Sequence, residues 1–198
     1  VSMAKMHPPP HHDHTQNQLP LMGRAAVVTG ASSGIGRAIA LELAAAGADV
    51  FLHGRSNQAG LKSTAAAARE FGRAAATCLA DLSEPAECES LLESVLAWRR
   101  DINIWINNAG ADVLTGDAKD WSFEQKLERL WKVDVAATIR LSRAAGGHMQ
   151  STSTPHAVIL NMGWDQADFG MEGDAGEMFA PVKAAVMAFT KSLAKTLA

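Results

Sequence analysis

The chain has 198 residues, of which 47% are hydrophobic and 20% charged, and its formal net charge is −3. This length fits one domain with a sizeable core, and the slight negative charge argues against a nucleic-acid-binding protein, because no basic excess neutralises phosphates. No apolar run approaches the roughly 18–20 residues that a membrane span needs. Two cysteines do not make a disulfide framework, so we expect a reduced, cytoplasmic protein with no nucleic-acid or membrane partner.

Residues 1–22 differ in composition from the rest of the chain. Four of the seven histidines and the run Pro8-Pro9-Pro10 lie here. The segment offers almost no apolar surface to offset the entropy cost of ordering. We expect a disordered leader without an assigned function, with a metal-binding tail as the alternative, followed by a single packed domain over residues 23–198.

Short apolar runs alternate with longer helical patterns from Gly23 onward. Strands are predicted at residues 25–29, 49–53, 75–79, 102–106 and 157–160. Helices are predicted at residues 35–46, at 59–71, from 83 onward, at 123–145 and from 179 to the last residue. Gly47 is expected to end the first helix in a left-handed conformation, and Ser83 to cap the third. Because strands alternate with helices in βαβ units, the expected fold class is α/β, with a doubly wound parallel sheet of the Rossmann type in a single domain.

Glycines cluster where the first strand meets the first helix, in the segment Thr29-Gly30-Ala31-Ser32-Ser33-Gly34-Ile35-Gly36. Gly30 permits a tight turn, Gly34 lets the backbone approach a pyrophosphate, and Gly36 lets the helix pack closely on the strand. The helix N-terminus presents oriented N–H groups to the anion. A strand before and a helix after are the context that this motif requires, so it predicts a dinucleotide-binding cradle and not a purely structural turn.

The G-x-x-x-G-x-G spacing resembles that of the short-chain dehydrogenase/reductase family, in particular its 3-oxoacyl-[acyl-carrier-protein] reductases. Three more motifs extend the resemblance over residues 24–198: Asp81-Leu82 after the third strand, Asn107-Asn108-Ala109-Gly110 after the fourth, and the helix from Lys183 onward. It implies an NAD(P) cofactor and a small-molecule substrate. It also implies a homodimer or homotetramer that assembles through the helix at 123–145 and the last helix. The cofactor contacts that it implies are Gly30, Ser32, Ser33, Gly34, Ile35, Gly36, Asp81, Leu82, Asn108, Ala109, Gly110 and Lys183.

The end of the second strand, His53-Gly54-Arg55-Ser56, bears on the choice of cofactor. NAD sites usually carry an acid at this point, which bonds the ribose 2′-hydroxyl, and none is present. Arg55 offers a planar donor fork that suits a 2′-phosphate, and Arg37 and Ser56 could assist it. We expect NADP(H) to be favoured over NAD(H); the alternative is that Arg55 is a solvated loop residue.

The catalytic positions that the resemblance implies are altered in this chain. Phe179 stands at the position of the family's proton-donating tyrosine, Trp164 at that of its serine and Asp134 at that of its asparagine, and the chain has no tyrosine. Phenylalanine has no proton to donate, and tryptophan offers a single N–H. We expect Lys183 to keep a role toward the ribose hydroxyls and to pair with Asp134, either as part of the chemistry or as a structural ion pair.

The segment 163–177 lies on the expected substrate side and carries five acids: Asp165, Asp168, Glu172, Asp174 and Glu177. A substitute general acid, a cation site and a solvated loop are three readings of it. The acids match no recognisable ligand spacing, and we expect no metal site.

Two classes of function fit these patterns. The first is an NAD(P)(H)-dependent oxidoreductase acting on a carbonyl/alcohol pair with the usual tyrosine and serine replaced. The alternative is a catalytically impaired, cofactor-binding pseudoenzyme that acts as a sensor or a partner subunit. A relative of the nucleotide-sugar epimerases fits less well, because those enzymes depend on the same tyrosine. Members of the family have seven strands, and the sequence pattern predicts five here. We therefore also expect that the chain continues beyond Ala198 or that a partner holds its last helix.

Overall fold

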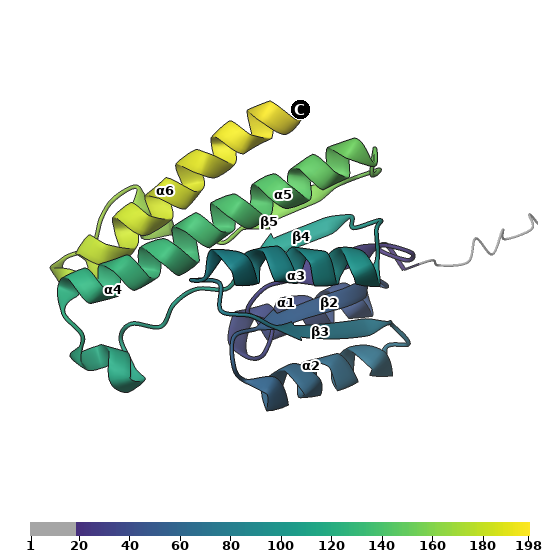
Figure 1. Cartoon of the computed structure of the whole chain (residues 1–198), viewed down its shortest axis with the longest axis horizontal. Coiled ribbons are helices and arrows are strands. Elements are labelled where there is room, and N and C mark those ends of the chain that lie inside the picture. The colour runs from purple at the N-terminus through teal and green to yellow at the C-terminus, as the bar shows by residue number, and fades with distance from the viewer. Residues whose placement is uncertain (1–18) are drawn as a thin grey trace, which may run out of the picture.

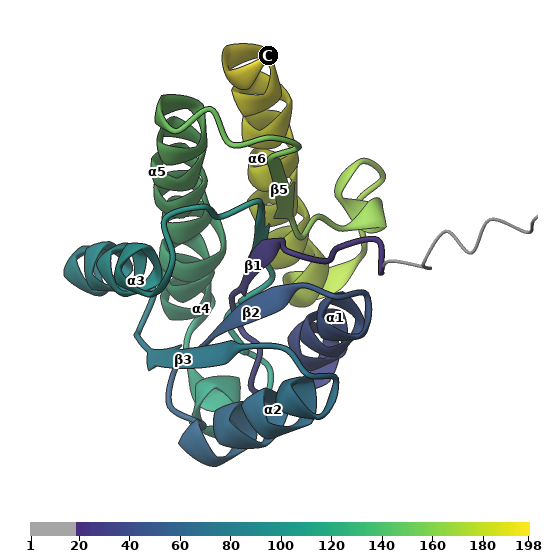
Figure 2. The same cartoon turned by 90° about the vertical axis from the view of Figure 1, so that its right-hand side faces the viewer.

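The computed structural model describes residues 19–198 (Figures 1 and 2). Within this part of the chain, five strands form one parallel sheet in the order β3-β2-β1-β4-β5. The strands are β1 (Ala25–Val28), β2 (Asp49–Gly54), β3 (Ala75–Leu79), β4 (Ile104–Asn107) and β5 (Val158–Asn161). The expected doubly wound α/β sheet is confirmed. Its strand order reverses between β1 and β4, and in such sheets ligands bind beyond the carboxyl ends of the strands at this point.

Helices cover both faces of the sheet, as Figure 2 shows in end view. On one face lie α1 (Gly34–Ala45) and α2 (Gln58–Glu70). On the other lie α3 (Pro85–Trp98), α5 (Ala137–Ser151) and α6 (Gly173–Leu197), with α4 (Phe123–Leu130) extending the line of α5 (Figure 1). Short 3₁₀ turns occupy Gly116–Asp120 and Asp165–Ala167.

The buried strand residues divide between two apolar clusters, because successive side chains point to opposite faces. Val27 and Trp105 pack toward α3 and α5, whereas Val28 and Ile106 pack toward α1 and α2. All four residues of β1 and all four of β4 are buried. These two central strands therefore form the rigid support for the loops that follow them.

The helix predicted at 123–145 is longer and less regular than expected. It runs to Ser151, and the π-helical turn Trp131–Ala136 joins α4 to α5. Asp134 lies within this turn and is buried. π-turns inside α-helices occur frequently at functional sites.

Two predicted helix starts are wrong. The last helix begins at Gly173 and not near Phe179, because Met178 continues the buried face of Val182 and Val186 at four-residue spacing. Ser83 does not cap α3, whose N-cap residue is Glu84; the Ser83 hydroxyl donates to Asp81 instead. The left-handed Gly47 is confirmed, with φ +106°.

The ends of the described region bear on three further expectations. Residues 1–18 of the proposed leader lie outside the described residues, and within the rest of it Leu21 donates its N–H to the Ala46 carbonyl at 2.9 Å; the domain boundary at residue 23 stays a prediction. Over residues 19–198, no helix combines the length and apolar character that crossing a membrane requires. On the edge strand β5, Val158 and Leu160 are exposed; that further chain or a partner covers such surface stays a prediction.

Candidate functional site

The turn between β1 and α1 has the backbone shape of an anion cradle. Gly30 and Gly34 have φ values of +69° and +54°, in the left-handed region that favours glycine. A Cβ on Gly36 would lie 2.3 Å from the Gly30 carbonyl oxygen, so helix and turn approach too closely for any side chain. At the first turn of α1 no side chain caps the N-terminus and no acid is present. Its free N–H groups therefore fit a phosphate.

The segment after β4 fastens this cradle from the other side of the switch point. The Asn108 side-chain amide donates to the Thr29 backbone carbonyl at 3.0 Å. The Thr29 hydroxyl accepts from the backbone N–H groups of Asn108 and Ala109 at 3.0 Å each. The preceding Asn107 is buried and donates to Ser142 on α5 and to Asn161 on β5. Asn107 therefore connects β4 to β5 and α5, while Asn108 stabilises the glycine turn.

One cavity of about 590 Å³ lies over the ends of β1, β2, β3 and β4. It brings together residues as far apart in the sequence as Gly30 and Val133. Every residue expected to contact the cofactor except Lys183 lines it: Gly30, Ser32, Ser33, Gly34, Ile35, Gly36, Arg55, Asp81, Leu82, Asn108, Ala109 and Gly110. The other lining residues are His53, Ser56, Asn57, Ala80, Ala111, Asp112, Arg129 and Val133. Of these, the sequence predicts a role toward the cofactor only for Ser56, which could assist Arg55.

His53 is a missed residue with a defined role in this geometry. It is 2% exposed, and its Nε2 lies 2.9 Å from the Ala80 carbonyl oxygen while its Nδ1 accepts the Gly30 N–H at 3.3 Å. Burial lowers the pKa of His53, only partly offset by the Ala80 hydrogen bond and by the charges of Asp81 and Glu87. The neutral ring with its proton on Nε2 satisfies both contacts, and it joins the ends of β1, β2 and β3.

Asp81, expected to contact the cofactor, is held by a second residue that the sequence analysis missed. Arg129 on α4 donates from Nη2 to both Asp81 carboxylate oxygens, at 3.0 and 3.1 Å. Burial would raise the pKa of Asp81, but the hydrogen bonds from Ser83 and Arg129 outweigh it, so the pKa lies below its ordinary value. The carboxylate is therefore ionised and fixed at the cavity wall.

Arg55 is exposed and lines the cavity at the end of β2, together with Ser56. Arg37, on the exposed side of α1, is not among the lining residues. Asp112 lines the same cavity, and the pKa of its carboxyl is lowered by hydrogen bonds from Thr115 and Leu114 and by the charge of Arg55. Arg55 and Arg129 are the two arginines that line this cavity, and Arg129 is already paired with Asp81.

The residues at the altered catalytic positions form a connected group beside the cavity. Lys183 donates to Asp134 at 2.9 Å and to the Met162 carbonyl at 3.3 Å, and its side chain is 14% exposed. Asp134 also accepts the N–H of Ala111, which lines the cavity, at 2.8 Å. The expected ion pair is thus present, and it links α6 and the π-turn to the segment after β4.

Two aromatic rings stand next to this ion pair. Phe179 lies one helical turn before Lys183, and its ring packs edge-to-face with that of Trp164, with 6.4 Å between the centroids. Both side chains are half-buried. The five acids of the 163–177 segment are exposed, and no group of three or more metal-binding side chains occurs among residues 19–198.

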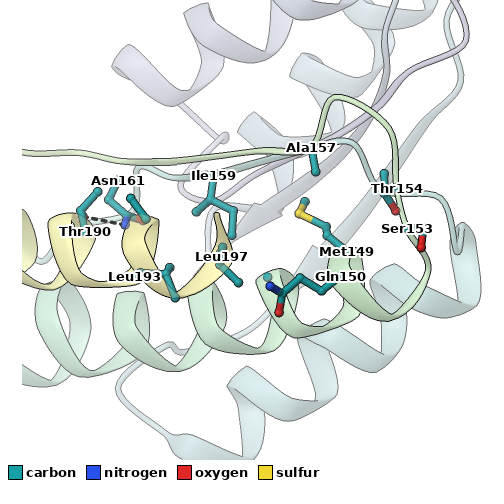
Figure 3. Close-up of a pocket in the computed structure, with 12 residues that line it drawn as sticks. Met149, Gln150, Ser153, Thr154, Ala157, Ile159, Asn161, Thr190, Leu193 and Leu197 are labelled. Carbon is teal, nitrogen blue, oxygen red and sulfur yellow. Dashed lines mark hydrogen bonds between the residues drawn. The ribbon is translucent and has the colours of Figure 1, made fainter.

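A second cavity, of about 470 Å³, lies between α5, β5 and α6, and Figure 3 shows its lining. Met149, Ile159 and Leu197 form its apolar part, and Asn161 donates to Thr190 at 2.9 Å across it. It contains no charged side chain and shares no lining residue with the first cavity. The first cavity is therefore the candidate site.

Comparison with known proteins agrees with this architecture. The model of the short chain dehydrogenase family matches residues 24–198. The 3-oxoacyl-[acyl-carrier-protein] reductase FabG of Escherichia coli is 34% identical over 178 residues, which are 89% of this chain and 68% of that protein. A blue fluorescent protein from a metagenomic library, solved in complex with NADPH, superposes with a TM-score of 0.77 at 30% identity over 90% of this chain and 70% of its own. NAD⁺-bound xylitol dehydrogenase superposes with a TM-score of 0.78 at 25% identity over 89% of this chain and 66% of its own. The chain belongs to the short-chain dehydrogenase family of oxidoreductases.

Proposed function

We propose that this chain is an NADP(H)-dependent oxidoreductase that works without the family's usual proton donor. One observation carries the proposal: twelve residues from four separate segments, each expected to contact a dinucleotide, line one cavity at the switch point of the sheet. A relative of known structure binds NADPH and another binds NAD⁺, so the choice between the two rests on this chain's own residues. Arg55, with no acid at the end of β2, favours the 2′-phosphate.

Each part of the site then has a task toward the cofactor, which when bound supplies or accepts a hydride. The α1 N-terminus and the glycine turn hold the pyrophosphate, Asp81 contacts the adenine, and Arg55 binds the 2′-phosphate. Lys183 has one N–H left after its bonds to Asp134 and to the Met162 carbonyl, and this N–H would donate a hydrogen bond to a hydroxyl of the nicotinamide ribose. A cytoplasmic location and a homodimer or homotetramer are part of the proposal.

Chemistry on a carbonyl/alcohol pair should be slow in the wild-type chain, because Phe179 and Trp164 supply neither the phenol nor the hydroxyl that such a reaction uses. The double variant Phe179→Tyr/Trp164→Ser restores both groups beside Lys183. General acid catalysis is worth about 10²–10⁴-fold, so we expect carbonyl reduction to rise at least about tenfold. The assay follows the loss of NADPH absorbance with a panel of ketones and aldehydes.

The same assay separates the proposal from its alternative. The absence of any tyrosine from the chain favours a pseudoenzyme that binds cofactor as a sensor or a partner subunit. If NADPH binds but neither the wild type nor the double variant turns over any substrate, the pseudoenzyme explains the chain better. If wild type reduces ketones well and Phe179→Tyr changes nothing, the proton comes from another group, and Asp134 and the acids of the 163–177 segment are the residues to replace next.

A further inference from the structure

The residues at the three altered positions, Asp134, Trp164 and Phe179, all make the substrate side less suited to a substrate that gains negative charge. A carbonyl oxygen gains negative charge as hydride arrives and needs hydrogen-bond donors aimed at it. Phe179 and Trp164 offer two aromatic rings, packed edge-to-face, and a single indole N–H. The positive charge of Lys183 is balanced by Asp134 at 2.9 Å, whose side chain is only 2% exposed. This surface is therefore poorly suited to a developing oxyanion.

The segment of the chain that contains Trp164 and Phe179 carries negative charge and exposed apolar side chains. Residues 163–182 contain five acids and no lysine or arginine. None of the ion pairs formed among residues 19–198 involves these acids. Phe169, on the same segment, is 87% exposed, and Met171 is exposed beside it in sequence. Aromatic faces together with uncompensated carboxylates are the surroundings that an organic cation prefers.

We propose that the site reduces an iminium ion, a cationic substrate with a C=N⁺ bond and apolar substituents. The inference rests on the proposed function, since a reduced nicotinamide supplies the hydride. The hydride adds to the iminium carbon, the C=N π pair becomes the lone pair of the nitrogen, and a neutral amine and an oxidised, cationic nicotinamide result. Charge and electrons balance without any proton transfer. A tyrosine-free site can therefore complete this reaction, whereas a ketone would leave an alkoxide that must be protonated.

The recognition step has a direct binding test that involves no turnover. N-methyl-3,4-dihydroisoquinolinium is a flat iminium ion, and alpha-tetralone is a neutral ketone of similar size and shape. Each is titrated by calorimetry into the full chain saturated with 1,4,5,6-tetrahydro-NADP, an analogue of NADPH whose ring is uncharged and cannot donate hydride. We expect the cation to bind about tenfold more tightly than the ketone, the range of a partly desolvated cation–π contact with added charge attraction.

Two matched variants locate the effect. Trp164→Leu keeps an apolar side chain but removes the π-face, and it should abolish most of the preference for the cation. Trp121→Leu changes a tryptophan that is 39% exposed and follows the 3₁₀ turn Gly116–Asp120, and it should leave the preference for the cation unchanged. Equal affinities for cation and ketone, or an unaltered preference in Trp164→Leu, would overturn the inference.

Turnover with NADPH gives the second readout. The wild type should reduce the iminium ion without a solvent deuterium isotope effect and should leave alpha-tetralone unreacted, and Phe179→Tyr should not accelerate the iminium reaction. Faster reduction of the ketone by wild type would overturn the inference alone. Failure of the chain to bind NADPH or NADP⁺ at all would overturn the proposed function and the inference with it, so the two failures are distinguishable.

Discussion

His53 couples the cofactor cradle to pH, and this coupling can be measured as a change in stability. In the folded chain Nδ1 must accept the Gly30 N–H, and this requires a neutral ring. Burial lowers the pKa of His53, so an unfolded chain takes up a proton that the folded chain resists. The free energy of unfolding should therefore be fully retained above the unfolded pKa of about 6.5 and should fall as the pH drops below it. With one proton involved, the fall is at most about 1.4 kcal/mol per pH unit.

Urea unfolding at about pH 7.5, 6.5 and 5.5 measures this slope, in a range where most carboxylates stay ionised. His53→Asn keeps an acceptor oxygen near the position of Nδ1 but does not titrate, so its stability should depend less on pH than that of wild type. The same variant loses the contact to Ala80 and should cost about 1–3 kcal/mol near neutral pH. His148→Asn, on α5 and outside the cavity, serves as the control. Equal pH slopes for wild type and His53→Asn would refute the reasoning.

Two further substitutions test the cradle and the cofactor preference. Arg55→Ala should remove about 1.5–3 kcal/mol of the preference for NADPH over NADH in calorimetric titrations. Arg37→Ala, outside the cavity, should leave the preference intact. An unchanged preference in Arg55→Ala would mean that Arg55 is a solvated loop residue that does not bind the 2′-phosphate. Gly36→Ala puts a Cβ 2.3 Å from the Gly30 carbonyl oxygen and should cost about 1–3 kcal/mol of stability in urea unfolding as well as NADPH affinity. Gly147→Ala, where no atom lies within 4 Å, is its matched control, and equal behaviour of the two variants would contradict the packing argument.

The cradle was predictable from sequence because its determinants are local. A tight turn, a close backbone approach and a helix N-terminus all lie between Thr29 and Gly36, so fixed spacing encodes them. The fold class followed for a similar reason, since each strand and helix has its own apolar period. The ion pair of Lys183 with Asp134 was anticipated only through the resemblance to a family.

The partners within the site were not predictable, because they depend on where distant elements dock. Arg129 is 48 residues from Asp81, and nothing in the pattern of α4 distinguishes it from a solvated arginine. His53 lies in a buried strand, and the sequence of that strand does not indicate that its ring accepts a hydrogen bond from the Gly30 N–H. The early start of α6 was missed because Gly173 and Gly176 resemble a loop, although buried Met178 could have extended the helical period. The π-turn around Asp134 has no sequence signature.

Calorimetric titration of the wild-type chain, with NADPH and with NADH under identical conditions, tests most directly whether the cavity at the β1/β4 switch point is an NADP(H) site. Arg55 and the absence of an acid at the end of β2 predict that NADPH binds at least about tenfold more tightly, the equivalent of 1.4 kcal/mol. Equal affinities, or tighter binding of NADH, would contradict the assignment of the cofactor, and no binding of either would contradict the assignment of the cavity.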